Sequence, residues 1–336
     1  MRIERNVGLT SAAMLLLSLG ESLWSKFLPK YLQALGAPAG AIGAYGTAKD
    51  FLDGIYQYPG GWLSDRFGRK RALLLFVVAA MAGYAIYAAA VSWQMVIAGL
   101  VLVMAWSSMA SPALFAVVGD SLPKGKRAIG FTIQALLRRF PLVIAPILGG
   151  MAINRLGVDA GTRSLLVVNI ALGLFALIAL RSMRVREVRY EPGSTVVHVW
   201  TSFPRGLRLL LISDVFARIC EGLVDVFLVL YATQVVGISA AQFGILVAVQ
   251  SVTSMLVYLP AAYFADRAGR KPVVIATFLA FAAFPLAVVS AHSMTQLMGA
   301  FVVGGLREIG EPARKSMIVD FAHESVRARS VGLYYL

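Results

Sequence analysis

Two long stretches of the sequence contain no charged residue, and they constrain the fold more than any other feature. The first runs from Ala72 to Val91 and the second from Val273 to Ala291. Each matches the roughly 20 apolar residues with which an α-helix crosses the hydrocarbon core of a bilayer. Charged residues make up only 14% of the chain, whereas soluble domains carry roughly 25%. We therefore expect an all-α membrane protein, and Cys220, the only cysteine, excludes an intrachain disulfide.

Apolar runs that alternate with short polar breaks predict ten membrane spans. We place them at about residues 9–34, 38–62, 72–92, 94–119, 128–153, 162–181, 207–235, 239–264, 272–291 and 294–319. The longest break, between Arg181 and Pro204, predicts a cytoplasmic linker at residues 183–206. This linker joins an N-terminal six-helix bundle, residues 1–182, to a C-terminal bundle, residues 207–336. The second bundle is expected to contain four complete helices and the start of a fifth.

Lysines and arginines gather on one side of this predicted topology. With the N-terminus inside, the cytoplasmic segments carry groups such as Arg66–Arg71 and Lys124–Arg127, whereas the outer loops hold only Arg155 and Arg163. This positive-inside bias predicts a multi-pass protein of the cell membrane, of the bacterial inner-membrane type, with a cytoplasmic N-terminus. It also accounts for the net charge of +14 without a nucleic-acid partner.

The sequence repeats itself at an offset of about 201 residues. The segment Pro59-Gly-Gly-Trp-Leu-Ser-Asp-Arg-Phe-Gly-Arg-Lys70 returns as Pro260-Ala-Ala-Tyr-Phe-Ala-Asp-Arg-Ala-Gly-Arg-Lys271. Further matches pair Gly36 with Gly237, Gly43 with Gly244, Pro112 with Pro312, Asp120 with Asp320 and Arg127 with Arg327. Such self-similarity predicts two halves with the same fold.

The repeated loop Gly-x-Leu-x-Asp-Arg-x-Gly-Arg-Lys resembles the signature loop of the major facilitator superfamily. The resemblance implies the major facilitator fold, with twelve helices in two pseudo-symmetric halves, a substrate cavity between them and alternating access by rocking. It also implies that the loops form a conformational latch on the cytoplasmic side. The corresponding residues here are Gly61, Asp65, Arg66, Gly68, Arg69, Lys70, Asp266, Arg267, Gly269, Arg270 and Lys271. Alternatively, these basic loops only determine topology.

The chain departs from this family pattern at two points. The first glycine of the motif is Gly61 in one copy but Ala262 in the other, which predicts a weaker helix approach in the second. A second half equal to the first would end near residue 382, whereas the sequence ends at Leu336. We therefore expect about ten complete helices, with most of an eleventh and all of a twelfth missing, and with them the partner of Asp65 in the latch.

Charged residues occur near the middle of several predicted spans, where they are costly unless they pair or face a polar cavity. On the seventh span, Asp214, Arg218, Glu221 and Asp225 are spaced four, three and four residues apart and share one helix face. On the second span, we expect Lys49 and Asp53 to form an i,i+4 ion pair that does not include Asp50. The candidate cavity or coupling residues are Glu21, Asp50, Asp53, Arg138, Arg139, Asp214, Arg218, Glu221, Asp225, Arg307, Glu308 and Glu311.

Each of these residues has a second interpretation. The charges can form interhelical salt bridges that only brace the fold, and this applies above all to Lys49–Asp53 and Glu311–Lys315. Arg138 and Arg139 suit an anionic substrate or pair with the excess acids. The segment Ala145-Pro-Ile-Leu-Gly-Gly150 resembles part of the family's antiporter motif, but its small residues equally favour close helix packing.

The expected function is secondary active transport of a small solute by alternating access, with protons as the coupling ion and efflux favoured over uptake. We expect a monomer in the lipid bilayer, without a cofactor, and no enzyme, because the sequence contains no catalytic or metal-binding motif. The alternatives are a facilitative uniporter and a truncated membrane module that does not transport. The sequence does not identify the substrate.

Overall fold

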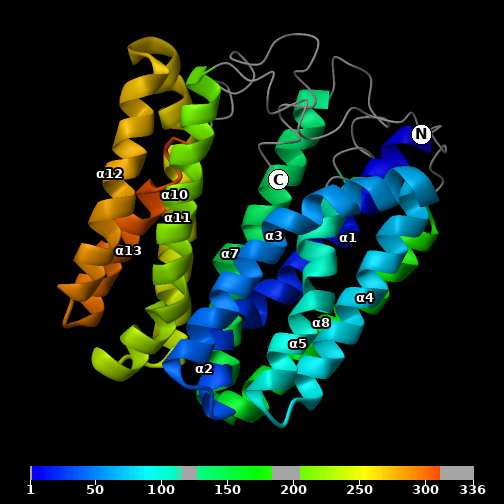
Figure 1. Cartoon of the computed structure of the whole chain (residues 1–336), viewed down its shortest axis with the longest axis horizontal. Helices are drawn as coiled ribbons and strands as arrows, with labels where there is room; N and C mark the ends of the chain where they lie inside the picture. The colour runs from blue at the N-terminus through cyan, green and yellow to red at the C-terminus, as the bar shows by residue number, and fades with distance from the viewer. Residues whose placement is uncertain (1, 112, 115–126, 184–204, 311–336) are drawn as a thin grey trace. The chain divides into compact units, whose positions relative to one another are not determined.

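The computed structural model describes residues 2–111, 113–114, 127–183 and 205–310 (Figure 1). All regular elements in this part of the chain are helices. Each of the ten predicted spans coincides there with one helix or with a run of consecutive helical segments. The all-α prediction is therefore confirmed for the described residues. The linker proposed at residues 183–206 lies almost entirely outside them, so the predicted bundle boundaries stay a prediction.

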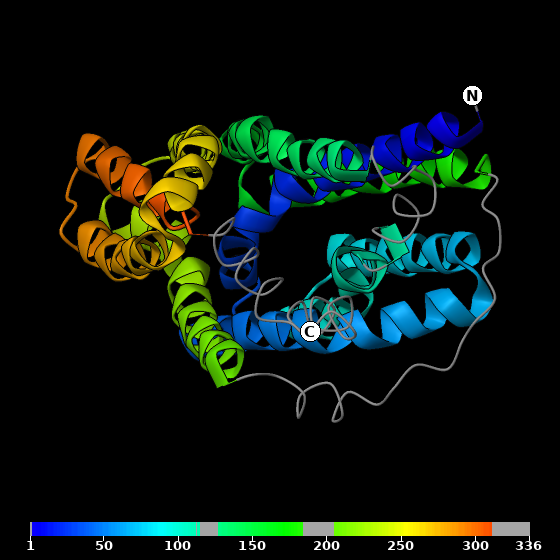
Figure 2. The same ribbon diagram turned by 90° about the horizontal axis from the view of Figure 1, so that it is seen from above.

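The chain divides into two compact units, residues 1–191 with 239–244, and residues 192–238 with 245–336. Unit 1 contains α1 (Arg2–Trp24), η1 (Ser25–Phe27), α2 (Leu28–Ala34), α3 (Ala39–Phe67), α4 (Arg69–Ala89), α5 (Trp93–Met104), η2 (Ala105–Met109), α7 (Arg127–Leu156) and α8 (Val158–Arg181). Within it, α1 packs against α7 and α8, and α4 packs against α5 and α8 (Figure 2). Large aromatic side chains, among them Trp24, Phe27 and Tyr84, fill its interior.

Unit 2 contains α10 (Arg205–Leu230), η4 (Tyr231–Val235), most of α11 (Ala240–Ala268), α12 (Arg270–Val289) and α13 (Met294–Leu306). Here α12 packs against α10 and α13. The rings of Phe284 and Phe301 meet edge to face, 5.7 Å apart, and both are buried. This contact joins α12 to α13 in the core of the unit.

The internal repeat is visible in the backbone. Helices α3 and α11 begin and end 201 residues apart, and the first residues of α4 and α12, and of α5 and α13, are separated by the same offset. Gly36 and Gly237 have φ values of 84° and 81°, and Gly68 and Gly269 have values of 85° and 88°. Only glycine adopts such positive angles readily, so the same turns recur because the same glycines recur.

Local sequence signals explain where individual helices begin. At the start of α11, the Ser239 side chain accepts a hydrogen bond from the Gln242 N–H at 3.2 Å, and the Gln242 side chain accepts one from the Ser239 N–H at 2.8 Å. This reciprocal capping box satisfies two backbone donors that a helix start leaves unpaired. At the start of α13, the Ser293 side chain similarly accepts from the Gln296 N–H.

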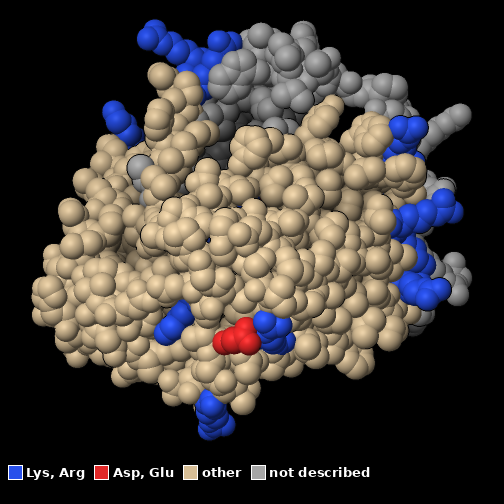
Figure 3. Space-filling view, turned by 60° about the horizontal axis from the view of Figure 1, so that its bottom comes forward, with Lys and Arg blue, Asp and Glu red and all other residues tan. Residues whose placement is uncertain are grey.

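The surface is that of a protein surrounded by lipid. By length and composition, four helical segments can cross a membrane: Arg69–Ala89, Val158–Arg181, Ala240–Val257 and Lys271–Val289. Helices α1, α3, α7 and α10, which carry most of the predicted intramembrane charges, are not among them. Large apolar side chains such as Ile178, Leu256 and Leu286 are more than 60% exposed. Charged side chains are sparse on the face shown in Figure 3, which suits contact with lipid rather than water.

The turn at Gly68 provides a test of the repeated backbone geometry. We expect Gly68→Ala to destabilise the chain by roughly 1–3 kcal/mol, because a Cβ atom is strained at φ 85° and ψ 140°. Gly40→Ala is the matched control, since Gly40 lies in the first turn of α3 and a Cβ there meets no atom within 4 Å. The unfolding temperatures of both variants in detergent check this. Equal temperatures for the two variants would contradict it.

Candidate functional site

A charge cluster in unit 2 is built around one buried arginine. Arg307 follows the last turn of α13, and its side chain is only 4% exposed. Its Nη1 atom lies 3.3 Å from Asp225 Oδ1 and 3.6 Å from Glu221 Oε1. Both carboxylates belong to α10 and are mostly buried, because the spacing of four residues places them on one helix face. The structure thus brings together three of the predicted residues.

Backbone and aromatic groups complete the surroundings of Arg307. Its Nε atom donates to the Gly304 carbonyl at 3.2 Å. Its guanidinium lies 4.3 Å from the ring centre of Phe284 and 5.5 Å from that of Phe281, both on α12. A Cβ atom at Gly304 would lie 2.7 Å from the Phe284 ring, so glycine permits this close approach of α13 to α12. Cation–π attraction strengthens when the cation is desolvated, as it is here.

Among the described side chains, two acids surround Arg307, and both acids also have further polar contacts. With both carboxylates ionised, Glu221, Asp225 and Arg307 carry a net charge of one negative unit, and one bound proton makes the group neutral. Several other predicted cavity or coupling residues cannot be placed beside this cluster. The side chains of Asp214 and Arg218, and the whole of Glu311, lie outside the described part of the chain, while Glu308 is half-buried next to Arg307 in sequence.

In unit 1 the acids of α3 have partners that differ from the predicted ones. Lys49 lies 3.6 Å from Asp50, so the i,i+4 pair expected between Lys49 and Asp53 is wrong. Asp53 instead accepts a hydrogen bond from the Ser108 hydroxyl at 2.5 Å. Ser108 belongs to η2, a π-helical segment that interrupts the helical pattern following α5. Sequence periodicity could not predict this contact, because a π-helical turn changes the direction of every side chain in it.

The other predicted cavity residues of unit 1 lie on α1 and α7. Glu21 is half-buried on α1, beside the aromatic core of the unit. Arg139 is half-buried on α7, and the side chain of Arg138 is not described. Farther along α7, a Cβ atom at Gly149 would overlap with the carbonyl of Leu23 on α1. Gly149, one of the glycines of the partial antiporter motif, therefore serves close helix packing.

The first copy of the signature loop contains a contact within unit 1. The Lys70 ammonium, in the first turn of α4, donates to the carbonyls of Arg181 at 2.5 Å and Met183 at 2.7 Å. These carbonyls lie at the C-terminal end of α8, where the helix leaves its last carbonyls without partners. A lysine there also interacts favourably with the negative end of the helix dipole. Lys70 thus ties the start of α4 to the end of α8.

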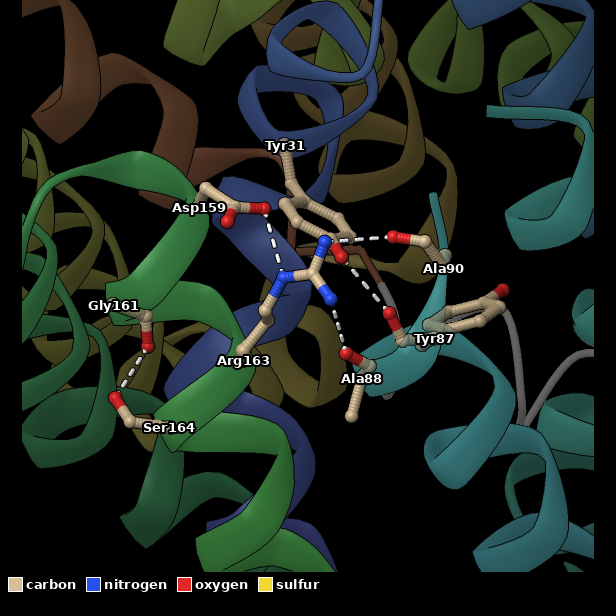
Figure 4. Close-up of polar contacts among 8 residues, drawn as sticks. All are labelled: Tyr31, Tyr87, Ala88, Ala90, Asp159, Gly161, Arg163 and Ser164. Carbon is tan, nitrogen blue, oxygen red and sulfur yellow. Dashed lines mark hydrogen bonds and ion pairs between the residues drawn. The ribbon is translucent and has the colours of Figure 1, made fainter. Parts of the chain in front are cut away.

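An arginine forms the matching contact at the other ends of the same two helices (Figure 4). Arg163, near the start of α8, donates to the carbonyls of Ala88 at 2.8 Å and Ala90 at 2.7 Å, at the end of α4. Asp159, one turn earlier, accepts from its Nε atom at 2.9 Å. The Tyr31 hydroxyl donates to the Tyr87 carbonyl beside them at 2.9 Å. The two antiparallel helices therefore cap each other at both ends.

The sequence analysis missed this reciprocal capping. It counted Arg163 only as an outer-loop charge and Lys70 only as part of the latch. The signal for Arg163 is its i,i+4 spacing from Asp159, which lies two residues after Gly157, so that the two form a charged pair in the first turns of a helix. That signal identifies the pair but not the carbonyls that the arginine reaches.

The remaining latch residues have the following places. Gly61 and Arg69 are half-buried, and Gly68 forms the positive-φ turn between α3 and α4. Arg66 stacks on the Trp62 ring at 5.0 Å, and its repeat partner Arg267 stacks on Tyr263 at 4.5 Å. Gly269 forms the second turn, and Lys271 is exposed. The side chains of Asp65, Asp266 and Arg270 lie outside the described part, so the latch stays a prediction.

No group of three or more His, Cys, Asp and Glu side chains that could hold a metal ion occurs among the described residues.

Comparisons with known proteins identify the family of this chain. The model of the Major Facilitator Superfamily matches residues 10–216 and again residues 210–336. The chain is 29% identical over 134 residues to the uncharacterized MFS-type transporter YqjV of Bacillus subtilis, covering 38% of this chain and 31% of that protein. It is 29% identical over 121 residues to the methylenomycin A resistance protein of the same organism, covering 36% and 25%. The matches thus span about a third or less of these curated relatives.

Solved structures share the fold at low sequence identity. A bacterial homologue of the human lysosomal transporter Spinster, inward-facing and unoccupied, has a TM-score of 0.79 and 16% identity. This match covers 99% of this chain and 78% of that one. A POT family transporter in complex with 5-aminolevulinic acid also has a TM-score of 0.79, with 12% identity, and the match covers 100% of this chain and 90% of that one.

Removal of the Arg163 contacts tests the reciprocal capping. We expect Arg163→Met to destabilise the chain by about 1.5–3 kcal/mol, because charge-assisted hydrogen bonds to the end of α4 are lost. Arg155→Met, in which an exposed arginine just before Gly157 is changed, is expected to have little effect. Thermal unfolding in detergent measures both variants. An Arg163→Met variant as stable as Arg155→Met would show that the contacts do not hold α4 and α8 together.

The ion pairs of Arg307 can be tested with a double-mutant comparison. Arg307→Gln removes the guanidinium that lies against two largely buried carboxylates, and we expect a loss of about 3–5 kcal/mol. Adding Asp225→Asn removes one of these two negative charges and should recover part of this loss. Unfolding of the single and double variants measures the coupling. Strictly additive effects would contradict a direct interaction between Arg307 and Asp225.

Proposed function

Because the chain belongs to the major facilitator superfamily, we propose that it moves a small solute across the membrane as a proton-coupled secondary transporter working by alternating access. This superfamily consists of transporters and not of enzymes. The proposal covers the activity, the coupling ion and the direction of transport. Its physical basis is the charge cluster of unit 2.

The single observation that supports proton coupling is that two largely buried carboxylates lie within 3.6 Å of one buried guanidinium. Glu221 and Asp225 share one guanidinium, at 3.6 Å and 3.3 Å from its Nη1 atom. A carboxylate in a low-dielectric region is stabilised by binding a proton or by pairing with a cation. Neutralising either acid weakens its attraction to Arg307, so the bound proton favours a different arrangement of α10 and α13. A ligand shifts a conformational equilibrium by such differential binding.

Export is the favoured direction. One relative is named a methylenomycin A resistance protein, and resistance is achieved when a transporter removes the compound from the cell. The segment Ala145–Gly150, which resembles part of the antiporter motif, also favours this direction. If a proton and an amphipathic solute compete for the same negative cluster, inward movement of the proton drives outward movement of the solute. This exchange is antiport.

The signature loops serve as the cytoplasmic latch in this proposal. The similar φ values of Gly68 and Gly269, 85° and 88°, support equivalent loops in the two halves. Lys70, which holds the end of α8, anchors the first loop to its own unit. Asp65, Arg66 and Arg69 of the same loop act in the latch in this proposal. The N-terminus is cytoplasmic and the transporter is a monomer in this proposal.

Transport in proteoliposomes with an acidic interior tests the proposal, with methylenomycin A as the probe. We expect the wild-type chain to accumulate the probe until an ionophore removes the pH gradient. Glu221→Gln and Asp225→Asn should abolish this accumulation but allow exchange of labelled for unlabelled probe, since proton binding is lost and alternating access is not. Asp159→Asn, an exposed acid outside the cluster, is the control and should behave as wild type.

Three outcomes contradict parts of this proposal. Accumulation that persists in both variants shows that the cluster only braces the fold. Flux that ignores the ionophore shows facilitative transport instead of coupling. A wild-type chain that moves no probe in either assay contradicts the export proposal.

A further inference from the structure

Arg307 has two kinds of partner, and the two kinds lie on different helices. The Gly304 carbonyl of α13 accepts a hydrogen bond from its Nε atom, and the rings of Phe281 and Phe284 on α12 cover its guanidinium. None of these three groups can take up a proton. The two carboxylates that lie against the guanidinium both belong to α10. Proton binding by these acids therefore weakens the contact between Arg307 and α10 but not the contacts with α12 and α13.

Phe284 is the nearer of the two rings and is itself packed in place. Its ring centre lies 4.3 Å from the guanidinium carbon of Arg307, whereas that of Phe281 lies 5.5 Å away. Phe284 is 0% exposed, and the Phe301 ring of α13 meets it edge to face. The face of an aromatic ring attracts a cation, and more strongly where water is excluded. Because the Phe284 ring cannot easily move, it also holds the guanidinium that lies over it.

The backbone on both sides of Arg307 is packed against neighbouring helices through glycines. A Cβ atom at Gly305 would lie 2.6 Å from Thr253 Cβ on α11. A Cβ atom at Gly310 would overlap with the Thr277 side chain on α12. Without a Cβ atom, glycine permits such close approach of the backbone. The segment that carries Arg307 is therefore held against α11 and α12.

The charged groups around the cluster come mainly from α10. Helix α11 has no charged residue at positions 240–265, and α12 has none at positions 272–289. Beside α13, Glu308 directly follows the arginine and is half-buried. On α10, Asp214 and Arg218 share the stripe of the two acids, and their side chains lie outside the described part of the chain. Helices α11 and α12 therefore contribute no charge to the cluster from these stretches.

Helix α10 is the less closely attached side of the cluster. In the described part of unit 2, α12 packs extensively along α13, whereas its contact with α10 is much smaller. The side chains of Glu221 and Asp225 are 18% and 25% exposed, against 4% for Arg307. Weaker ion pairing therefore affects the attachment of α10 more than the packing of α12 on α13.

We infer that Phe284 is a positioning residue for the charge cluster. Its ring holds the Arg307 guanidinium on the side of α12 and α13, so that the acids of α10 face a cation that stays in place. Binding of a proton to either acid then releases α10, and Arg307 does not follow it. The release of α10 rests on the proposed proton coupling, whereas the positioning of Arg307 by Phe284 does not.

Infrared spectroscopy of the full chain in lipid nanodiscs tests the positioning. The carboxyl bands of Glu221 and Asp225 are identified by their loss in Glu221→Gln and Asp225→Asn. In Phe284→Leu the guanidinium is no longer held against the acids. Because a nearby cation favours the ionised form of a carboxyl group, we expect the bands to appear at a higher pH than in the wild-type chain. Phe284→Tyr, which keeps the ring, should restore the wild-type pH.

The control for this titration is Phe76→Leu, which removes a buried ring from α4 in unit 1. Its bands should appear at the wild-type pH. Bands at the wild-type pH in Phe284→Leu, or an equal shift in Phe76→Leu, would overturn the positioning role, because a ring that only fills space produces either result.

The coupling between Arg307 and Asp225 provides a second measurement that needs no proton binding. It is obtained from the unfolding of Arg307→Gln, Asp225→Asn and their combination, once with Phe284 and once with Phe284→Leu. We expect the coupling to fall by roughly half or more in the Phe284→Leu background. An equal coupling in both backgrounds would overturn the positioning role. If Arg307→Gln does not fold, the infrared titration decides, since it uses no Arg307 variant.

Distances between spin labels within unit 2 test the release of α10. In a Cys220→Ala background, the label sites are Leu223→Cys on α10, Leu286→Cys on α12 and Val302→Cys on α13, three exposed positions. Acidification should change the distance between the labels on α10 and α12 and leave that between α12 and α13 unchanged. A change only between α12 and α13, or no change in either distance, would overturn the release.

The outcomes separate this inference from the proposed function. Glu221→Gln combined with Asp225→Asn should show the acidic label distances at alkaline pH as well. Carboxyl bands that never appear on acidification contradict proton coupling itself, and the coupling between Arg307 and Asp225 then decides the role of Phe284. Bands that appear without movement of α10 contradict only the release. None of these measurements requires transport.

Discussion

The cost of placing a charge in hydrocarbon governs this structure. An ionised side chain inside a bilayer costs several kcal/mol unless other groups compensate it, and Arg307 is compensated on every side that the structure describes. Asp225 and Glu221 face its guanidinium, Gly304 accepts from Nε, and two phenylalanine rings cover it. The residue therefore joins α10, α12 and α13, and the two acids of the same group supply the proposed site for a proton.

The backbone groups at the ends of helices impose a second constraint. Carbonyls in the last turn of a helix have no partner within it. Lys70 and Arg163 satisfy such carbonyls on α8 and α4 in turn, which explains why each cation lies in the first turns of the neighbouring antiparallel helix. The signature loop therefore combines a contact within unit 1 with the proposed latch.

The charge-free runs and the internal repeat of the sequence predicted the fold well. Charge-free runs identify spans because a bilayer demands a fixed length of apolar residues, and the offset of 201 recurs in helix boundaries and glycine turns. The stripe on α10 likewise predicted that Glu221 and Asp225 share a face. Contacts between helices were harder to predict from the sequence. The predicted pair of Lys49 with Asp53 was wrong because Ser108, in the π-helical segment η2, donates a hydrogen bond to Asp53 instead. The capping by Arg163 depends on helix ends that meet only in three dimensions.

Proton uptake by the purified chain tests the central claim most directly, namely that the cluster of Glu221, Asp225 and Arg307 binds a proton. A pH-indicator dye reports the protons bound by the chain in nanodiscs as the solution changes from mildly alkaline to mildly acidic. The account predicts that Glu221→Gln combined with Asp225→Asn binds fewer protons than Asp159→Asn, which lacks only an exposed acid. Equal uptake by the two variants would contradict it.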